Sequence, residues 1–393
     1  MTEPVAVTSL EPENSTQRPP KRPGTGPPPL GQMPGILVGS KVDSRSIHKI
    51  MASRDMSHDK PSKTRPTRRA VFRLSGGTAL VSALVGIREL TRSAVSEEEQ
   101  AGGPVIDTHT HVVPPGLPGI KPMPEDVEKL YKGPLSGMAD RLKVEMDQAK
   151  LKFAFGMGSL EGLKEDPLGI ARTLELSKSV PGLKAIGVAD PRRTEPEHLR
   201  AVEAQIERHR EKLVAFKAYL GYLYFGPEDP NYVPYYRLAA KYHLPVIVHT
   251  GDNWSTTAKV KYAHPLRMDE VAVDHSEVRF VLAHFGNPWL IDAAEVVFKN
   301  PNVWADLSGL FVGGDKEIQD LLDAAKIPDS APGLVVSDLK KAIGYVGDYK
   351  KFLYGSDWPL APMGSYRRLI ESLFPKEHHQ EVFRTNAEHV FNI

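Results

Sequence analysis

Val105-Ile106-Asp107-Thr108-His109-Thr110-His111 is an apolar run that ends in a His-X-His pair. Side chains at positions i and i+2 share one face of a strand, so His109 and His111 can point together at one metal ion. Asp107 lies on the same face, one layer deeper. A His-X-His pair alone is more often structural than metal-binding, and its significance therefore depends on the rest of the chain.

Short apolar runs recur along the chain after this one, separated by segments with helical periodicity. They are mostly continuous, which is typical of parallel strands buried on both faces. Eight strand–helix units over about 290 residues match the size of a (β/α)₈ TIM-type barrel, with a doubly wound sheet as the alternative. The eight runs are Val105–His109, Phe153–Gly158, Leu183–Ala189, Leu213–Ala218, Leu244–His249, Arg279–His284, Val303–Leu307 and Phe352–Gly355.

Two helices between these runs have readable boundaries. Thr194-Glu195-Pro196-Glu197 is a cap with Pro in the first turn, and it predicts a helix through His198–Lys212. A second helix is expected over Pro234–Tyr242, just before the fifth strand.

Ionisable residues follow several of the strands directly. Lys217, His249, His284 and Asp357 each come at the carboxyl end of a run, as His109 and His111 do. The carboxyl ends of the strands carry the active site in (β/α)₈ enzymes. Packing alone hardly explains this repeated placement, which favours the barrel over the doubly wound sheet and predicts a metal site at one rim.

Five phrases of the sequence resemble a known family. The phrases are IDTHTH (106–111), PVIVHTG (245–251), VLAHFG (281–286), LYGSDWP (353–359) and RTNAEHVF (384–391). Together they are similar to the amidohydrolase superfamily, and within it to the amidohydrolase-related group that includes aminocarboxymuconate-semialdehyde decarboxylase. The resemblance covers about Gly103 to Ile393. It implies a distorted (β/α)₈ barrel that binds one divalent ion, usually zinc. The resemblance does not decide whether a second ion binds.

The resemblance also implies roles for single residues. Asp357 would both bind the metal and take a proton from water, and His284 would be a catalytic acid/base or a ligand of a second metal. Lys217 falls where related binuclear enzymes carry a carboxylated, metal-bridging lysine, although members with plain lysine and a metal-free lactonase branch leave its use open. The ligands of the first metal would be His109, His111, His249 and Asp357.

The chemistry of such a site allows three functions. A zinc-like cation lowers the pKa of water toward about 7, so that hydroxide can attack a lactone, ester or amide carbonyl. The same residues could instead assist a non-oxidative decarboxylation of an unsaturated or aromatic acid. A non-catalytic barrel that only binds small molecules is the third candidate, and the full ligand set argues against it.

Substrate-binding candidates lie in the loops after the strands. Arg192, next to Arg193, could clamp a substrate carboxylate or could be a solvated pair at a helix start. The loop residues could be pocket walls for a planar or apolar substrate, or could simply pack the loops. They are Tyr219, Tyr222, Asp252, Asn253, Trp254 and Trp289.

The first hundred residues divide into two segments before the barrel domain at 103–393. Residues 1–66 are rich in Pro, Gly and polar residues and are expected to be disordered. In residues 67–102, Arg68 and Arg69 precede an apolar run from Leu74 to Ile87, which resembles a twin-arginine export signal followed by a linker. A buried helix is the alternative. The protein is accordingly either exported to the periplasm or cytoplasmic.

The composition excludes several classes of partner. The 50 basic and 49 acidic residues give a net charge of +1, which provides no field to attract nucleic acid or an anionic membrane surface. The absence of Cys removes disulfides and thiolate ligands, so a metal must be held by His, carboxylate or a lysine-derived oxygen. We expect a small carbonyl or carboxylate substrate and no stable membrane span. The sequence is compatible with a homo-oligomer.

Overall fold

The computed structural model describes residues 103–161, 165–327 and 330–393. The expectations for residues 1–66 and 67–102, including the export-signal interpretation of Leu74–Ile87, lie outside the described residues. Within the described part, no helix has the length and apolar character needed to cross a membrane.

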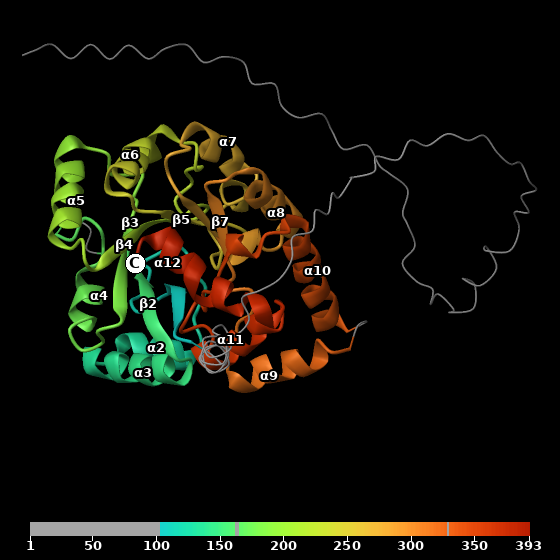
Figure 1. The fold of residues 1–393 in the computed structure, drawn as a ribbon. Helices are drawn as coiled ribbons and strands as arrows, with labels where there is room; N and C mark the ends of the chain where they lie inside the picture. Colours follow the sequence, from blue (N-terminus) through green and yellow to red (C-terminus); the bar gives the residue numbers. More distant parts are fainter. Residues whose placement is uncertain (1–102, 162–164, 328–329) are drawn as a thin grey trace, which may run out of the picture. The chain divides into compact units, whose positions relative to one another are not determined.

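One eight-stranded sheet, with helices around it, forms the body of the protein (Figure 1). Neighbouring strands are parallel and follow the order of the chain, which confirms the predicted (β/α)₈ barrel. The observed strands overlap all eight predicted runs. They are β1 Val105–Thr110, β2 Leu151–Met157, β3 Leu183–Val188, β4 Leu213–Ala218, β5 Val246–His249, β6 Phe280–Ala283, β7 Val303–Asp306 and β8 Phe352–Leu353.

The helices lie where the chain connects one strand to the next. Pro196 starts the helix before β4, as its place in a first turn predicts, and His243 ends the helix before β5 in a left-handed conformation. The α-helices are α2 Glu125–Lys132, α3 Leu135–Gln148, α4 Ala171–Leu176, α5 Pro196–Arg208, α6 Val233–Tyr242, α7 Arg267–Asp274, α8 Leu290–Lys299, α9 Asp315–Ala324, α10 Ala331–Val346, α11 Met363–Glu371 and α12 Asn386–Phe391. Short 3₁₀ turns span Pro230–Tyr232, Val260–Tyr262, His284–Gly286, Tyr349–Lys351 and Lys376–His378, and a π turn spans Glu381–Thr385.

The barrel closes irregularly between its first and last strands. β8 has only two residues, and the described strands form no regular β1–β8 ladder. The seam is instead joined by the segment after β8. The Thr108 amide donates to the Tyr354 carbonyl at 3.0 Å, and the Asp357 amide donates to the His109 carbonyl at 2.9 Å. This closure brings Asp357 directly beside β1.

The interior of the barrel is apolar below the rim. Ile106, Phe155, Ile247 and Leu353 pack there, together with Phe391 of α12. The Phe155 and Phe391 rings are 4.8 Å apart, and Figure 1 shows α12 in the middle of the ring of strands. Because α12 and these side chains fill the amino-terminal end, space for a ligand is left at the carboxyl ends of the strands.

Candidate metal centre

Three side chains converge across the seam of the barrel. His109 comes from β1, His111 from just beyond it, and Asp357 from the turn after β8. Asp357 Oδ1 lies 3.5 Å from His109 Nε2 and 3.4 Å from His111 Nε2. Their ligand atoms all lie within 4.8 Å of one another, as one metal ion requires. The sequence predicted that these three residues would meet.

The protonation of His109 shows that this group fits a cation. Its Nδ1 lies 2.9 Å from Asp306 Oδ2 and must carry the hydrogen, because a carboxylate only accepts. Burial lowers the pKa of His109 to about 3, so the ring is neutral and Nε2 holds a lone pair. That lone pair faces Asp357 Oδ1, and neither atom has a hydrogen-bond partner among the described residues.

The charge state of Asp357 agrees with this interpretation. Burial alone would raise the pKa of its carboxyl, but the imidazole of His111, 3.4 Å from Oδ1, holds it below the ordinary value. Two acceptors that face each other without a proton repel, and a cation between them removes the repulsion. Imidazole nitrogen and carboxylate oxygen are the ligands that zinc and similar divalent ions take in proteins.

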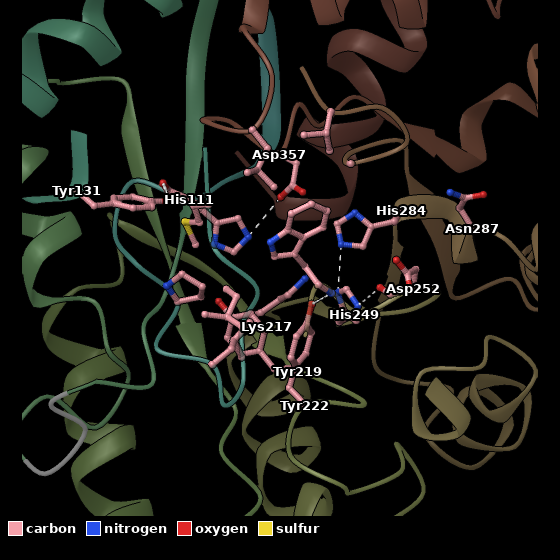
Figure 2. Close-up of a pocket in the computed structure, with 18 residues that line it drawn as sticks. His111, Tyr131, Lys217, Tyr219, Tyr222, His249, Asp252, His284, Asn287 and Asp357 are labelled. Atoms are coloured by element: carbon pink, nitrogen blue, oxygen red, sulfur yellow. Dashed lines mark hydrogen bonds and ion pairs between the residues drawn. The ribbon is translucent and has the colours of Figure 1, made fainter. Parts of the chain in front are cut away.

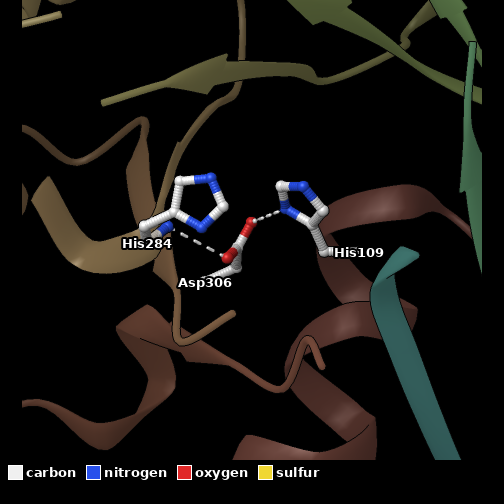
Figure 3. A group of neighbouring side chains, drawn as sticks. All are labelled: His109, His284 and Asp306. Atoms are coloured by element: carbon white, nitrogen blue, oxygen red, sulfur yellow. Dashed lines mark hydrogen bonds and ion pairs between the residues drawn. The ribbon is translucent and has the colours of Figure 1, made fainter. Parts of the chain in front are cut away.

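A second group, formed by His109, His284 and Asp306, also has the proximity of a metal site (Figure 3). Its atoms are already satisfied by hydrogen bonds. Asp306 Oδ2 accepts from the His109 ring, and Asp306 Oδ1 accepts from the His284 backbone amide at 3.2 Å. The group with orphaned atoms is therefore the better candidate for a metal site, and we interpret this one as a hydrogen-bonded network.

His249 and His284 face each other beside the metal group (Figure 2). His249 Nε2 donates to the Asp252 carbonyl at 2.8 Å, and His284 Nδ1 donates to the Ser308 carbonyl at 3.0 Å. The remaining nitrogens, His249 Nδ1 and His284 Nε2, are 3.2 Å apart. In two neutral rings both are acceptors, so this contact is favourable only when a proton or another cation is shared. His249 belongs to neither three-residue ligand group.

Two of these residues adopt backbone conformations that L-residues rarely take. His284 and Asp357 both have φ of 61°, in the left-handed region. Such strain is maintained where the surrounding structure holds a side chain in one place, and it concentrates at functional sites.

The pocket above these residues combines aromatic walls with one buried cation. Lys217 Nζ is fully buried without a hydrogen-bond partner among the described residues, and burial lowers its pKa to about 8. Tyr219, Tyr222 and Trp254 form part of the wall. The lining comprises His111, Pro115, Leu117, Ile120, Met123, Tyr131, Lys217, Tyr219, Tyr222, His249, Asp252, Trp254, His284, Asn287, Gly309, Val312, Asp357 and Leu360 (Figure 2).

Three of the suggested substrate-binding residues do not line this pocket. The Arg192 guanidinium donates twice to Asp190 at 2.8 Å. The buried Asn253 donates to the Leu220 carbonyl at 3.1 Å. The Trp289 ring packs on His264, 4.7 Å between centroids. The Arg192 contact is an ion pair, and the contacts of Asn253 and Trp289 join neighbouring rim loops, as the packing alternative for these two residues predicts.

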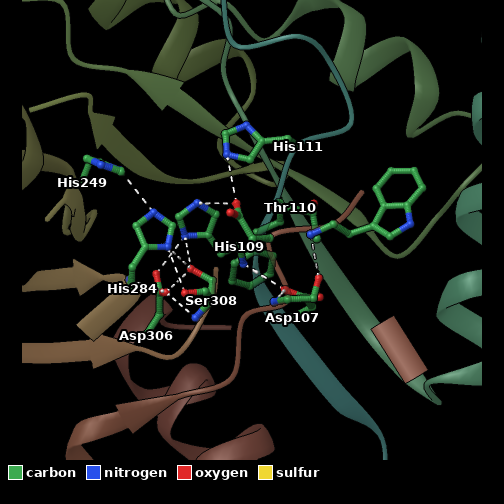
Figure 4. A network of polar contacts seen from close by, with 12 residues as sticks. Asp107, His109, Thr110, His111, His249, His284, Asp306 and Ser308 are labelled. Atoms are coloured by element: carbon green, nitrogen blue, oxygen red, sulfur yellow. Dashed lines mark hydrogen bonds and ion pairs between the residues drawn. The ribbon is translucent and has the colours of Figure 1, made fainter. Parts of the chain in front are cut away.

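Sequence reasoning missed Asp306 and Ser308. Asp306 ends β7 and is fully buried, and its carboxylate contacts the rings or backbone of both His109 and His284 (Figure 4). A signal was available, because Asp306 interrupts the apolar strand of NVWADLSG (302–309) at its carboxyl end. That is the level at which the other strands present their ionisable residues.

Comparison with known proteins agrees with the fold. The family model described as Amidohydrolase matches residues 106–393. The chain belongs to the amidohydrolase family. This confirms the resemblance found in the sequence, and with the His/Asp group it identifies a metal-dependent enzyme of this family. No curated protein sequence matches the chain.

Several solved structures share the architecture. The 5-carboxyvanillate decarboxylase from Sphingomonas paucimobilis has a TM-score of 0.50 at 15% identity, over 74% of this chain and 99% of that one. The enzyme from Novosphingobium aromaticivorans, complexed with manganese and 4-hydroxy-3-methoxy-5-nitrobenzoic acid, has a TM-score of 0.52 at 12% identity, over 75% and 97%. An uncharacterised TIM-barrel protein from Bordetella bronchiseptica has a TM-score of 0.50 at 17% identity, over 74% and 99%. At these identities the likeness establishes the fold.

Proposed function

We propose that the protein is a metal-dependent hydrolase that cleaves a C–O or C–N bond of a small lactone, ester or amide. The observation that carries the proposal is the unprotonated contact of His109 Nε2 with Asp357 Oδ1, 3.5 Å apart beneath an aromatic pocket. A divalent ion, which we propose is zinc, would supply Lewis acidity and lower the pKa of a water from 15.7 toward about 7.

The side chains around this position have complementary roles in hydrolysis. We propose that the ion is held by His109, His111 and Asp357, with His249 as a further ligand through Nδ1. Asp357 would accept a proton from the attacking water, and His284, once its Nε2 has taken up a proton, would donate to the developing oxyanion or to the leaving group. Tyr219, Tyr222 and Trp254 would pack against a planar substrate and exclude bulk water.

Decarboxylation of an unsaturated or aromatic acid is the second candidate. The fold shared with two 5-carboxyvanillate decarboxylases favours it, as does the unpaired Lys217 ammonium, which could hold a carboxylate. We rank it second because Arg192, the predicted carboxylate clamp, is engaged by Asp190 and does not line the pocket.

The test is metal quantification on the full chain followed by a substrate panel of lactones, esters, amides and carboxylated aromatic acids. Hydrolysis predicts about one divalent ion per chain and water uptake without CO₂ release. Release of CO₂ from the acids would contradict the hydrolase proposal and support the decarboxylase. A protein without stoichiometric metal, inactive on the whole panel when zinc or manganese is added, would instead indicate a non-catalytic binding protein.

A further inference from the structure

We propose that Asp306, acting with Ser308, is a positioning residue that fixes the tautomers of His109 and His284 together, so that the Nε2 lone pair of His109 faces Asp357 and that of His284 faces His249. The proposal rests on the metal site of the proposed function, because His109 binds a metal through Nε2 only as the Nδ1–H tautomer. Figure 4 shows the carboxylate and hydroxyl between the two rings.

The two oxygens of Asp306 have different partners. Oδ1 accepts from the backbone amides of Ser308 at 3.0 Å and His284 at 3.2 Å, and from the Ser308 hydroxyl. Oδ2 accepts from His109 Nδ1 at 2.9 Å. Backbone amides can only donate, so the Oδ1 position must remain an acceptor. This leaves Oδ2 to determine the hydrogen on His109.

Ser308 extends the same constraint to His284. Its only hydroxyl hydrogen is donated to Asp306, so Oγ is left as an acceptor. That oxygen lies 3.0 Å from Nδ1 of His109 and 3.0 Å from Nδ1 of His284, whose hydrogen the Ser308 carbonyl also accepts at 3.0 Å. Asp306 and Ser308 are fully buried, so bulk water does not compete for these atoms. Both imidazoles are therefore required to carry hydrogen on Nδ1.

The substitution Asp306→Asn reverses this requirement with almost no change in shape. The amide oxygen must take the Oδ1 position, opposite the two backbone amides, which places the NH₂ group against His109 Nδ1. An NH₂ group donates, so His109 must move its hydrogen to Nε2 and lose the ligand lone pair. Asp306→Ala removes the same charge but supplies no donor, and Ser308 Oγ can still accept from His109 Nδ1.

The experiment measures zinc affinity of the full chain by chelator competition. We expect Asp306→Asn to lower the affinity about 10–100-fold, the range found when a partner of a metal-binding His is mutated. Asp306→Ala should lose less than Asp306→Asn, although its cavity destabilises the protein more. Asp190→Asn, a buried carboxylate that binds Arg192 instead, is the matched control and should keep wild-type affinity.

A second measurement needs no metal and uses a variant only to assign a signal. Nitrogen-15 NMR of labelled histidine in the metal-free protein, assigned by loss of a signal in His109→Gln, should show hydrogen on Nδ1 of His109. An Nε2–H form in the wild type would overturn the proposal, as would wild-type zinc affinity in Asp306→Asn or a larger loss in Asp306→Ala. If the wild type binds no metal, the proposed function fails while the NMR result still decides the tautomer.

Discussion

Asp357 combines an uncommon backbone conformation with a carboxylate that lies within 3.5 Å of both His109 and His111. Its left-handed φ of 61° costs roughly 1–2 kcal/mol for an L-residue, and this cost is met where the segment after β8 closes the barrel on His109. The neighbouring imidazoles, His111 first among them, keep the carboxyl ionised despite burial. The residue therefore joins closure of the fold to formation of the site.

Asp357→Asn tests this role directly. The amide removes the negative charge opposite His109 and His111, so we expect metal affinity to fall by more than about 100-fold, beyond the range for residues that only contact a ligand. Activity on any substrate from the panel should fall with it. Metal content after dialysis and kcat/KM are the measurements. Asp292→Asn, on the partly exposed surface of α8, should leave both at wild-type values.

Lys217 predicts a pH effect on stability. Its pKa falls from 10.5 to about 8 on folding because burial disfavours the ammonium, so between these pH values the native state binds fewer protons than the unfolded state. By linkage, the free energy of unfolding then rises with pH from about 8 to 10.5. Below pH 8 the buried ammonium of Lys217 destabilises the native state by about 3 kcal/mol, at 1.36 kcal/mol per pH unit.

Lys217→Met should remove that penalty in the metal-free protein. We expect the free energy of unfolding at pH 7 to rise by about 1–3 kcal/mol and its slope between pH 8 and 10.5 to flatten. Urea unfolding at several pH values measures both. Lys299→Met, which removes an exposed partner of Asp269, should change stability by less than about 0.5 kcal/mol. A destabilised Lys217→Met protein would contradict this prediction, because it would show that interactions in the native state offset the cost of burying the ammonium.

At the scale of elements, the pocket wall is built by two loops that bind each other. The Lys121 amide donates to the Trp254 carbonyl at 3.1 Å, and the Thr256 amide donates to the Gly119 carbonyl at 3.0 Å. The Ser255 hydroxyl also donates to the Pro118 carbonyl at 2.8 Å. The loop after β1 and the loop after β5 thus form one wall, which holds Trp254 at the pocket.

Gly119→Ala should separate these loops. Gly119 has φ of +61°, and a Cβ there would lie 2.2 Å from Thr257 Oγ1, so both the conformation and the contact oppose a side chain. We expect KM to rise about 10-fold or more while metal content stays constant, because the wall moves and the ligands do not. Gly344→Ala, in open space on α10, should instead stabilise by about 0.5–1 kcal/mol. An unchanged KM would mean that this wall does not contact substrate.

The strands and the ionisable residues at their ends could be predicted, whereas the loop contacts could not. Buried parallel strands read as continuous apolar runs, and the residue after each run must lie at one rim, so His111, His249 and Asp357 could be placed from local sequence. Asn253 and Trp289 contact Leu220 and His264, which lie in other loops and are not revealed by any local pattern. Arg192 pairs with Asp190, only two residues away, so its partner could have been read from the sequence. Asp306 was missed because it was taken as part of a buried apolar strand. A carboxylate in such a strand needs polar partners, and this requirement could have revealed it.

At the scale of the whole molecule, the metal group lies across the one irregular joint of the barrel. Its three side chains come from β1 or just beyond it and from the segment after β8. These two parts are held together by a few backbone bonds and not by a regular ladder among the described strands. An ion bound by both sides would therefore act as an additional link between the two ends of the sheet.

This arrangement predicts that removing the metal loosens the seam first. An ion that binds only the native state stabilises it by about 2.7 kcal/mol at a concentration 100 times Kd, equivalent to about 5–10 °C in Tm for a domain of this size. Chelation should lower Tm by that amount and raise amide exchange in residues 105–111 and 352–359 before β3 to β5. Asp357→Asn should have the lower Tm already and should not respond to added metal. An equal response in this variant would place the ion elsewhere and leave the seam closed by its backbone bonds alone.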